Sequence, residues 1–158
     1  MGERRIVQRG LWFEEFEVDA VYVHSPGRTV TEADNVLFSA LTMNPQSLHL
    51  DAAASAGTEF GERLINSMFT LSTLVGLSVA QLTQGTIVAN LGFSDVRFPA
   101  PVRAGATLYA ETTVLAKRLS RSRAGQGIVE LAHTMRDQDG TVVATATRQT
   151  LVRCRPAD

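Results

Sequence analysis

The sequence contains a single cysteine, Cys154, among its 158 residues. One cysteine cannot form an internal disulfide, and no second cysteine stands at the spacing that a zinc site requires. Charge of one sign is not in excess either, since the sequence has 15 lysines and arginines and 16 aspartates and glutamates. The resulting net charge of −1 argues against a nucleic-acid-binding protein that relies on bulk electrostatic attraction.

Long hydrophobic runs are absent as well. The most apolar stretch, residues 68–82, is interrupted by serine, threonine, glutamine and glycine, so the sequence predicts no membrane span and no membrane partner. Residues 1–5 lead into an aromatic and acidic stretch without the apolar core of a secretory signal. A cytoplasmic location is the expectation that follows by default.

The composition that remains, 44% hydrophobic and 20% charged, suits one domain with a substantial core. Three helices are expected. Thr31 predicts an N-cap for a helix that follows it and that Pro45 limits near Met43. A short helix is expected over residues 51–56, and the longest runs over residues 66–82. Its apolar residues occupy several faces, which is typical of a helix buried on most sides.

After the long helix, the sequence pattern becomes typical of β-strands. Strands are expected over residues 86–98, 107–116, 127–136 and 141–153, with a further short strand over 20–24. Consecutive long strands joined by short turns are largely antiparallel. The pattern therefore predicts an α+β domain in which a twisted antiparallel sheet wraps around the long helix.

Four blocks of residues carry a resemblance to a known family. They read TVTEAD (29–34), LTMNPQSLHLD (41–51), FGERLINSM (60–68) and VRFPAPVRAG (96–105). In the same order they resemble the motifs T-x-x-D, L-T-G-D-x-N-P-L-H-x-D, G-x-x-I-x-H-G-M and V-x-F-x-x-P-V-x-x-G-D of MaoC-like dehydratases, the (R)-specific enoyl-CoA hydratases. Several blocks in the right order are more specific than any one alone.

The resemblance implies the hot-dog fold, a single MaoC-like domain over residues 1–158, and a homodimer or higher homo-oligomer. It also implies reversible addition of water to a 2-enoyl-CoA thioester, which is the substrate; no further cofactor is implied. Residues 88–93 and 96–98 are similar to the subgroup that acts on mesaconyl-CoA and β-methylmalyl-CoA. The acyl group is therefore expected to be short or branched.

Site residues follow from the same resemblance, one position at a time. His49 matches the catalytic histidine, and Asn44 stands at the position of the catalytic aspartate. The backbone N–H of Ser67 is expected to polarise the thioester carbonyl. The residues expected to bind substrate are Gln46, Arg97 and Arg63, the arginines because their forked guanidinium groups fit a distal carboxylate. His24 and His133 lack motif context and are interpreted as structural.

Asn44 leaves three hypotheses open, because an amide cannot accept the proton of water at neutral pH. His49 alone transfers the protons, or a carboxylate of Asp51, Glu62 or Asp34 replaces the missing one, or hydration is lost and the domain only binds acyl-CoA. A hot-dog acyl-CoA thioesterase is a further alternative. Residues 67–82 hold none of the helical carboxylates that such thioesterases commonly use, which argues against it.

Overall fold

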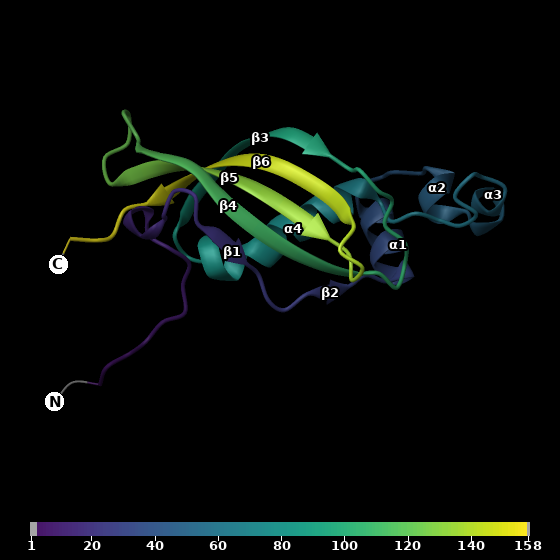
Figure 1. The fold of residues 1–158 in the computed structure, drawn as a ribbon, viewed down its shortest axis with the longest axis horizontal. Coiled ribbons are helices and arrows are strands. Elements are labelled where there is room, and N and C mark those ends of the chain that lie inside the picture. The colour runs from purple at the N-terminus through teal and green to yellow at the C-terminus, as the bar shows by residue number, and fades with distance from the viewer. Residues whose placement is uncertain (1–2, 158) are drawn as a thin grey trace.

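The structure, a computed structural model, describes residues 3–157, and Figure 1 shows a curved sheet that closes around one long helix. The N-terminal half supplies short elements and the helix, and the C-terminal half supplies the long strands. In chain order the elements are η1 (Phe13–Glu15), β1 (Val21–Val23), β2 (Arg28–Thr29), α1 (Glu32–Leu41), α2 (Ser47–Leu50), α3 (Ala52–Ala56), α4 (Ser67–Leu82), β3 (Ile87–Arg97), β4 (Thr107–Leu119), β5 (Gln126–Arg136) and β6 (Val142–Arg153).

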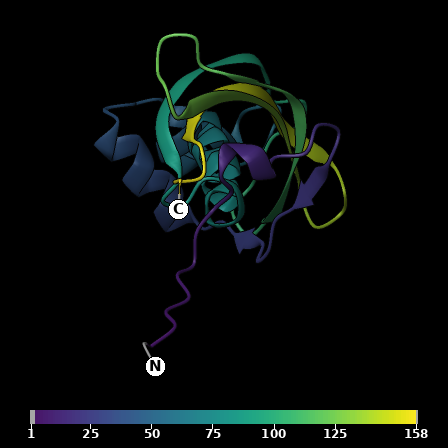
Figure 2. The same cartoon turned by 90° about the vertical axis from the view of Figure 1, so that its left-hand side faces the viewer.

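The sheet is antiparallel, with the strand order β1-β4-β5-β6-β3, and β2 also pairs with β4. The predicted antiparallel strands are therefore confirmed. Alternate residues of β5 are buried, as expected for a strand with one face toward a core. Figure 2, which looks toward one end of the domain, shows the strands curving around the helix.

Helix α4 lies in the concave face of this sheet and contacts β4, β5 and β6. Asn66 is its N-cap, because the Asn66 side chain accepts a hydrogen bond from the Met68 N–H at 3.0 Å. Phe69, Leu74 and Leu82 are buried along its length. No helix within residues 3–157 is long and apolar enough to cross a membrane.

Two hydrophobic clusters lie between α4 and the sheet. Along the strands, a row of buried polar side chains separates one cluster from the other. Thr112 Oγ1 lies 2.7 Å from His24 Nε2 and 2.8 Å from His133 Nδ1. The cluster at the end of the sheet nearest α1 consists of Val30, Ile65, Phe69, Leu74, Val102, Leu108, Ala110, Met135, Val143 and Ala144. The other consists of Phe13, Phe16, Leu82, Val114, Val129, Leu131 and Val152.

Helix α1 begins where the sequence predicts, with Thr31 Oγ1 accepting the Asp34 N–H at 3.3 Å. Two of its apolar residues, however, face solvent, since Leu37 is 62% exposed and Leu41 is 75% exposed, whereas Phe38 is half-buried against the core. The buried residues of α1 are Asn35 and Ser39, both polar. The helix was predicted correctly from periodicity, but its buried residues are not the apolar ones. Helices α1, α2 and α3 lie together at one end of the domain (Figure 1).

Candidate active site

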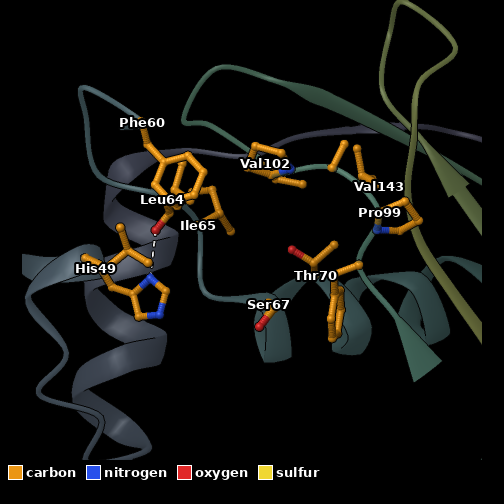
Figure 3. A pocket seen from close by; sticks show the side chains of 13 residues that line it. His49, Phe60, Leu64, Ile65, Ser67, Thr70, Pro99, Val102 and Val143 are labelled. Carbon is orange, nitrogen blue, oxygen red and sulfur yellow. Dashed lines mark hydrogen bonds between the residues drawn. The ribbon is translucent and has the colours of Figure 1, made fainter. Parts of the chain in front are cut away.

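A cavity of about 260 Å³ opens at the end of the domain that carries α1, α2 and α3. Its walls come from α2, from the segment before α4, from the first turns of α4, from residues 98–102 and from β6. Polar groups reach it from three side chains, His49, Ser67 and Thr70. The remaining lining is apolar: Leu48, Phe60, Leu64, Ile65, Phe98, Pro99, Ala100, Pro101, Val102 and Val143 (Figure 3).

His49 is held by one ring nitrogen. Its Nδ1 donates a hydrogen bond to the backbone carbonyl oxygen of Leu64 at 2.9 Å, which Figure 3 shows as a dashed line. Since a carbonyl oxygen can only accept, Nδ1 carries the hydrogen in the neutral ring and Nε2 keeps its lone pair. Figure 3 shows the free edge of the ring on the side toward Ser67. The geometry therefore suits His49 as a proton acceptor inside the cavity.

Ser67 is the first residue of α4, immediately after the Asn66 cap. The first backbone N–H groups of a helix have no partner within the helix. The Met68 N–H is taken up by the Asn66 side chain, whereas the Ser67 N–H has no hydrogen-bond acceptor among residues 3–157. A free N–H at a helix N-terminus favours a partial negative charge nearby, so it suits a developing oxyanion.

Asn44 and Gln46 shape the turn that leads into α2. Asn44 is half-buried, and its Oδ1 accepts the Gln46 N–H at 3.1 Å. Gln46 Oε1 in turn accepts the Ser47 N–H at 3.1 Å and caps α2. Neither residue lines the cavity. The Nδ2 group of Asn44 remains free to donate, because its oxygen is the atom that the turn uses.

The three carboxylates considered as replacements are engaged elsewhere. Asp34 binds Thr31 and Arg28. Asp51 accepts the Ala54 N–H at 2.9 Å as the cap of α3, and Glu62 pairs with Arg103 at 2.6 Å. Within residues 3–157, no carboxylate oxygen lies within ion-pair distance of the His49 ring.

The two arginines considered for a distal carboxylate differ in their surroundings. Arg63 pairs with Glu32 at 2.8 Å and lines a second cavity, separate from the one that His49 lines. Arg97 is exposed at the end of β3, and its guanidinium has no partner among residues 3–157. It directly precedes the wall formed by residues 98–102. Neither arginine lines the cavity, and Arg97 is the one next in sequence to its wall that has no ion-pair partner within residues 3–157.

His24 and His133 lie outside the cavity, in the polar row beneath α4. His24 Nδ1 lies 2.8 Å from the Gln81 side-chain oxygen. Burial, together with the nearby Arg148 and His24, lowers the pKa of His133 to about 3. Burial also lowers the pKa of His24. The His133 ring is therefore neutral near pH 7.

Sequence reasoning did not identify most of the cavity wall. Residues 98–102 belong to the fourth motif block, so their place beside the site was open to prediction. Val143, which lies outside the motif blocks, carried no such signal, because an apolar residue in a strand has the same pattern whether it faces a core or a cavity. Asn35, buried in α1, was also missed.

The chain is similar to several known proteins. The family model described as MaoC like domain matches residues 14–136. Protein MaoC from Klebsiella aerogenes is 33% identical over 123 residues, which cover 78% of this chain and 36% of that protein. Mesaconyl-CoA hydratase from Haloarcula marismortui is 28% identical over 143 residues, 90% of this chain and 40% of that protein. The chain thus spans about two fifths of the length of these curated relatives.

Solved structures of similar proteins superpose on this fold. An R-hydratase from Pseudomonas aeruginosa in the unliganded form superposes with a TM-score of 0.76 and 26% identity, covering 92% of this chain and 88% of that one. A Mycobacterium tuberculosis protein with a double hot-dog fold superposes with a TM-score of 0.81 and 22% identity, covering 94% and 46%. The expected hot-dog fold, an antiparallel sheet wrapped around a central helix, is confirmed.

Proposed function

This chain belongs to the MaoC-like domain family, and on that premise we propose that it reversibly hydrates a 2-enoyl-CoA thioester. The observation that carries the proposal is the meeting of two groups at one cavity. His49 presents a nitrogen lone pair there, and Ser67 presents an unpaired N–H at the start of α4. Hydration of an enoyl thioester needs both, a base for water and a donor for the carbonyl oxygen.

The reaction balances with His49 as the only acid–base group. His49 Nε2 takes one proton from water while the hydroxide oxygen bonds to C3 of the enoyl group. The C2–C3 π electrons move toward the thioester carbonyl, and the enolate oxygen accepts the Ser67 N–H. The imidazolium then returns its proton to C2, which restores the carbonyl. A preorganised donor at the oxyanion contributes about 3–4 kcal/mol and positioned acid–base catalysis about 10²–10⁴-fold.

Asn44 takes the role of a water-binding group in this scheme. Its Oδ1 is used by the turn, which leaves Nδ2 as its donor toward the attacking water, although Asn44 does not itself line the cavity. Gln46 acts one step further away, because it caps α2 and thereby fixes the helix that carries His49. The proton transfers themselves remain with His49.

The size and polarity of the cavity favour a short or branched acyl group. Its volume of about 260 Å³ lies below the lower end, about 300 Å³, of typical ligand pockets. Among the described residues, no aspartate, glutamate, lysine or arginine lines it, so a carboxylate deep inside would be desolvated without an ion-pair partner. A carboxylated acyl group is compatible with the site where its carboxylate reaches Arg97 at the mouth.

We also propose that the active assembly is a homodimer formed through β3. This strand pairs only with β6 among the described elements, so its other edge offers free backbone groups. Leu91 and Phe93 on β3, and Phe98 just after it, are exposed apolar side chains. Molecular mass by light scattering tests this; a monomer at micromolar concentration would contradict it.

A second candidate is acyl-CoA binding without turnover. The observation that favours it is the absence of a carboxylate near the His49 ring among residues 3–157. Purified protein mixed with crotonyl-CoA and mesaconyl-CoA separates the candidates. Hydration removes the enoyl-thioester absorbance band. Calorimetric binding with an unchanged band indicates the second candidate, and release of free thiol indicates a thioesterase.

A further inference from the structure

We propose that Asn35 is a positioning residue that fixes His49 and the N-terminus of α4 to each other. The inference rests on the proposed function, because it assigns Asn35 a part in that same site. Asn35 lies on α1 and does not line the cavity with His49. It acts on the site through backbone groups, and all the groups that it binds belong to the two segments that carry the site.

The Asn35 side chain is 3% exposed and uses both ends of its amide. Its Nδ2 donates to the backbone oxygen of His49 at 3.1 Å and to that of Leu64 at 3.0 Å. Its Oδ1 accepts the backbone N–H of Asn66 at 2.8 Å. Three hydrogen bonds therefore run from one side chain to α2 and to the segment that enters α4.

The Leu64 carbonyl oxygen is the point at which Asn35 acts on His49. That oxygen receives two donors, Asn35 Nδ2 and His49 Nδ1. A carbonyl held by the buried amide stays in one orientation and so selects the ring tautomer with the hydrogen on Nδ1. This is the tautomer that leaves Nε2 free as a base. Without the amide, the Leu64–Ile65 peptide keeps the hydrogen bond from the Ile65 N–H to the Val102 carbonyl oxygen at 2.9 Å but loses its donor at the Leu64 oxygen, and the selection weakens.

The Asn66 N–H is the point at which Asn35 acts on the oxyanion donor. Asn66 is the N-cap of α4, and the free N–H of Ser67 follows it directly. The hydrogen bond to Asn35 Oδ1 therefore fixes the peptide from which α4 starts. Since the same amide holds His49, it joins the base and the oxyanion donor, alongside the direct hydrogen bond from the Leu64 N–H to the Leu48 carbonyl oxygen at 3.0 Å. A displacement of about 1 Å in such a pair can cost about 10²-fold in rate.

The burial pattern of α1 supports a role in positioning in addition to the packing of Phe38 against the core. Leu37 and Leu41 of this helix are exposed, whereas Asn35 and Ser39 are buried. A helix that served only the core would bury its apolar face. Asparagine is also the side chain that the contacts require, since two carbonyl oxygens need a donor and one N–H needs an acceptor. An aspartate of the same shape would keep the acceptor and lose the donors.

The test compares Asn35→Asp with Ser39→Ala. Ser39 is buried on the same helix and its Oγ accepts the Asn66 side-chain N–H at 3.3 Å, but it contacts neither His49 nor Leu64. The first measurement is the ¹⁵N spectrum of the imidazole nitrogens, with the His49 signals assigned from His49→Ala. It reports the tautomer of His49 without any turnover. The second is kcat and KM with crotonyl-CoA, and the third is the thermal midpoint of each variant.

We expect wild type and Ser39→Ala to show His49 as the Nδ1–H tautomer, and Asn35→Asp to show a mixture. We expect kcat of Asn35→Asp to fall about 10- to 100-fold with KM changed less than about twofold. Where a buried carboxylate prevents folding, Asn35→Ser supplies the same comparison. An unchanged tautomer and kcat in the Asn35 variants, with a lowered thermal midpoint, would overturn the proposal. A wild type that is inactive while the tautomer still shifts would instead refute the hydratase function and keep the positioning.

Discussion

His49 and Leu64 are joined by a hydrogen bond of 2.9 Å between the ring Nδ1 and the backbone carbonyl oxygen. Leu64 lies three residues before Ser67, so the base of the site is attached to the segment that begins α4. This attachment explains how a histidine on the four-residue helix α2 keeps a defined orientation. Because Nδ1 is engaged, the proton-accepting role belongs to Nε2.

Asn44→Asp is expected to raise kcat for hydration by about tenfold or more, because it adds a second acid–base group beside the attacking water. The aspartate retains the oxygen that accepts the Gln46 N–H, so the turn before α2 is preserved. Initial rates with crotonyl-CoA across pH 5 to 9 measure the effect, and Gln46→Glu is the control for added charge alone. A rate that stays at the wild-type level would remove Asn44 from the water site.

Ser67→Pro is expected to lower kcat by about 10²–10³-fold, because it deletes the N–H that polarises the thioester carbonyl. Proline is tolerated at the first position of a helix, and Asn66 already has a ψ of 124°, which suits a residue before proline. Ser67→Ala retains the N–H and is expected to keep kcat within about threefold. Equal losses in both variants would assign the effect to the hydroxyl instead.

Arg97→Ala is expected to raise KM for mesaconyl-CoA by about fivefold, the loss typical of an exposed ion pair. KM for crotonyl-CoA, which has no distal carboxylate, should not change. Arg63→Ala is the matched control, because Arg63 is engaged with Glu32 beside a different cavity. A parallel rise in KM for both substrates would indicate that Arg97 contacts the CoA portion.

Folding stability is expected to fall as pH decreases from 6.5 toward 4.5, before most carboxylates titrate. Burial lowers the pKa of His133 to about 3, and burial also lowers that of His24. In this window the unfolded chain binds protons at these rings while the native state does not, so acid favours unfolding. His133 contributes about 1.4 kcal/mol per pH unit. Urea unfolding at pH 6.5 and 5.0 measures the slope; equal stabilities would contradict the assigned burial.

Much of the fold was predictable from periodicity. The four long strands were expected within a few residues of their observed bounds, because alternation and turn residues mark them. The order of strands was not, since β3 pairs with β6 at the edge of the sheet and not with β4, which follows it in sequence. Strand order depends on how the sheet closes around α4, and no local pattern encodes that.

The site was predictable in part for a similar reason. The motif blocks brought His49 and Ser67 into consideration, and the structure places both at one cavity. They did not indicate that Asn44 and Gln46 would serve the turn, or that Asn35 would join the two segments. A buried asparagine on a helix leaves no mark in the hydrophobic periodicity of the sequence. Its role depends on hydrogen bonds to backbone groups that are distant in sequence.

The most direct test of the account is the rate of crotonyl-CoA hydration by wild type and by His49→Ala, followed through the enoyl-thioester absorbance. His49 is half-buried and makes one side-chain hydrogen bond, so the substitution should cost no more than about 1.5 kcal/mol of stability. The account predicts turnover by wild type and a loss in kcat of about 10²–10⁴-fold in the folded variant. A folded His49→Ala protein that hydrates crotonyl-CoA at the wild-type rate would contradict it.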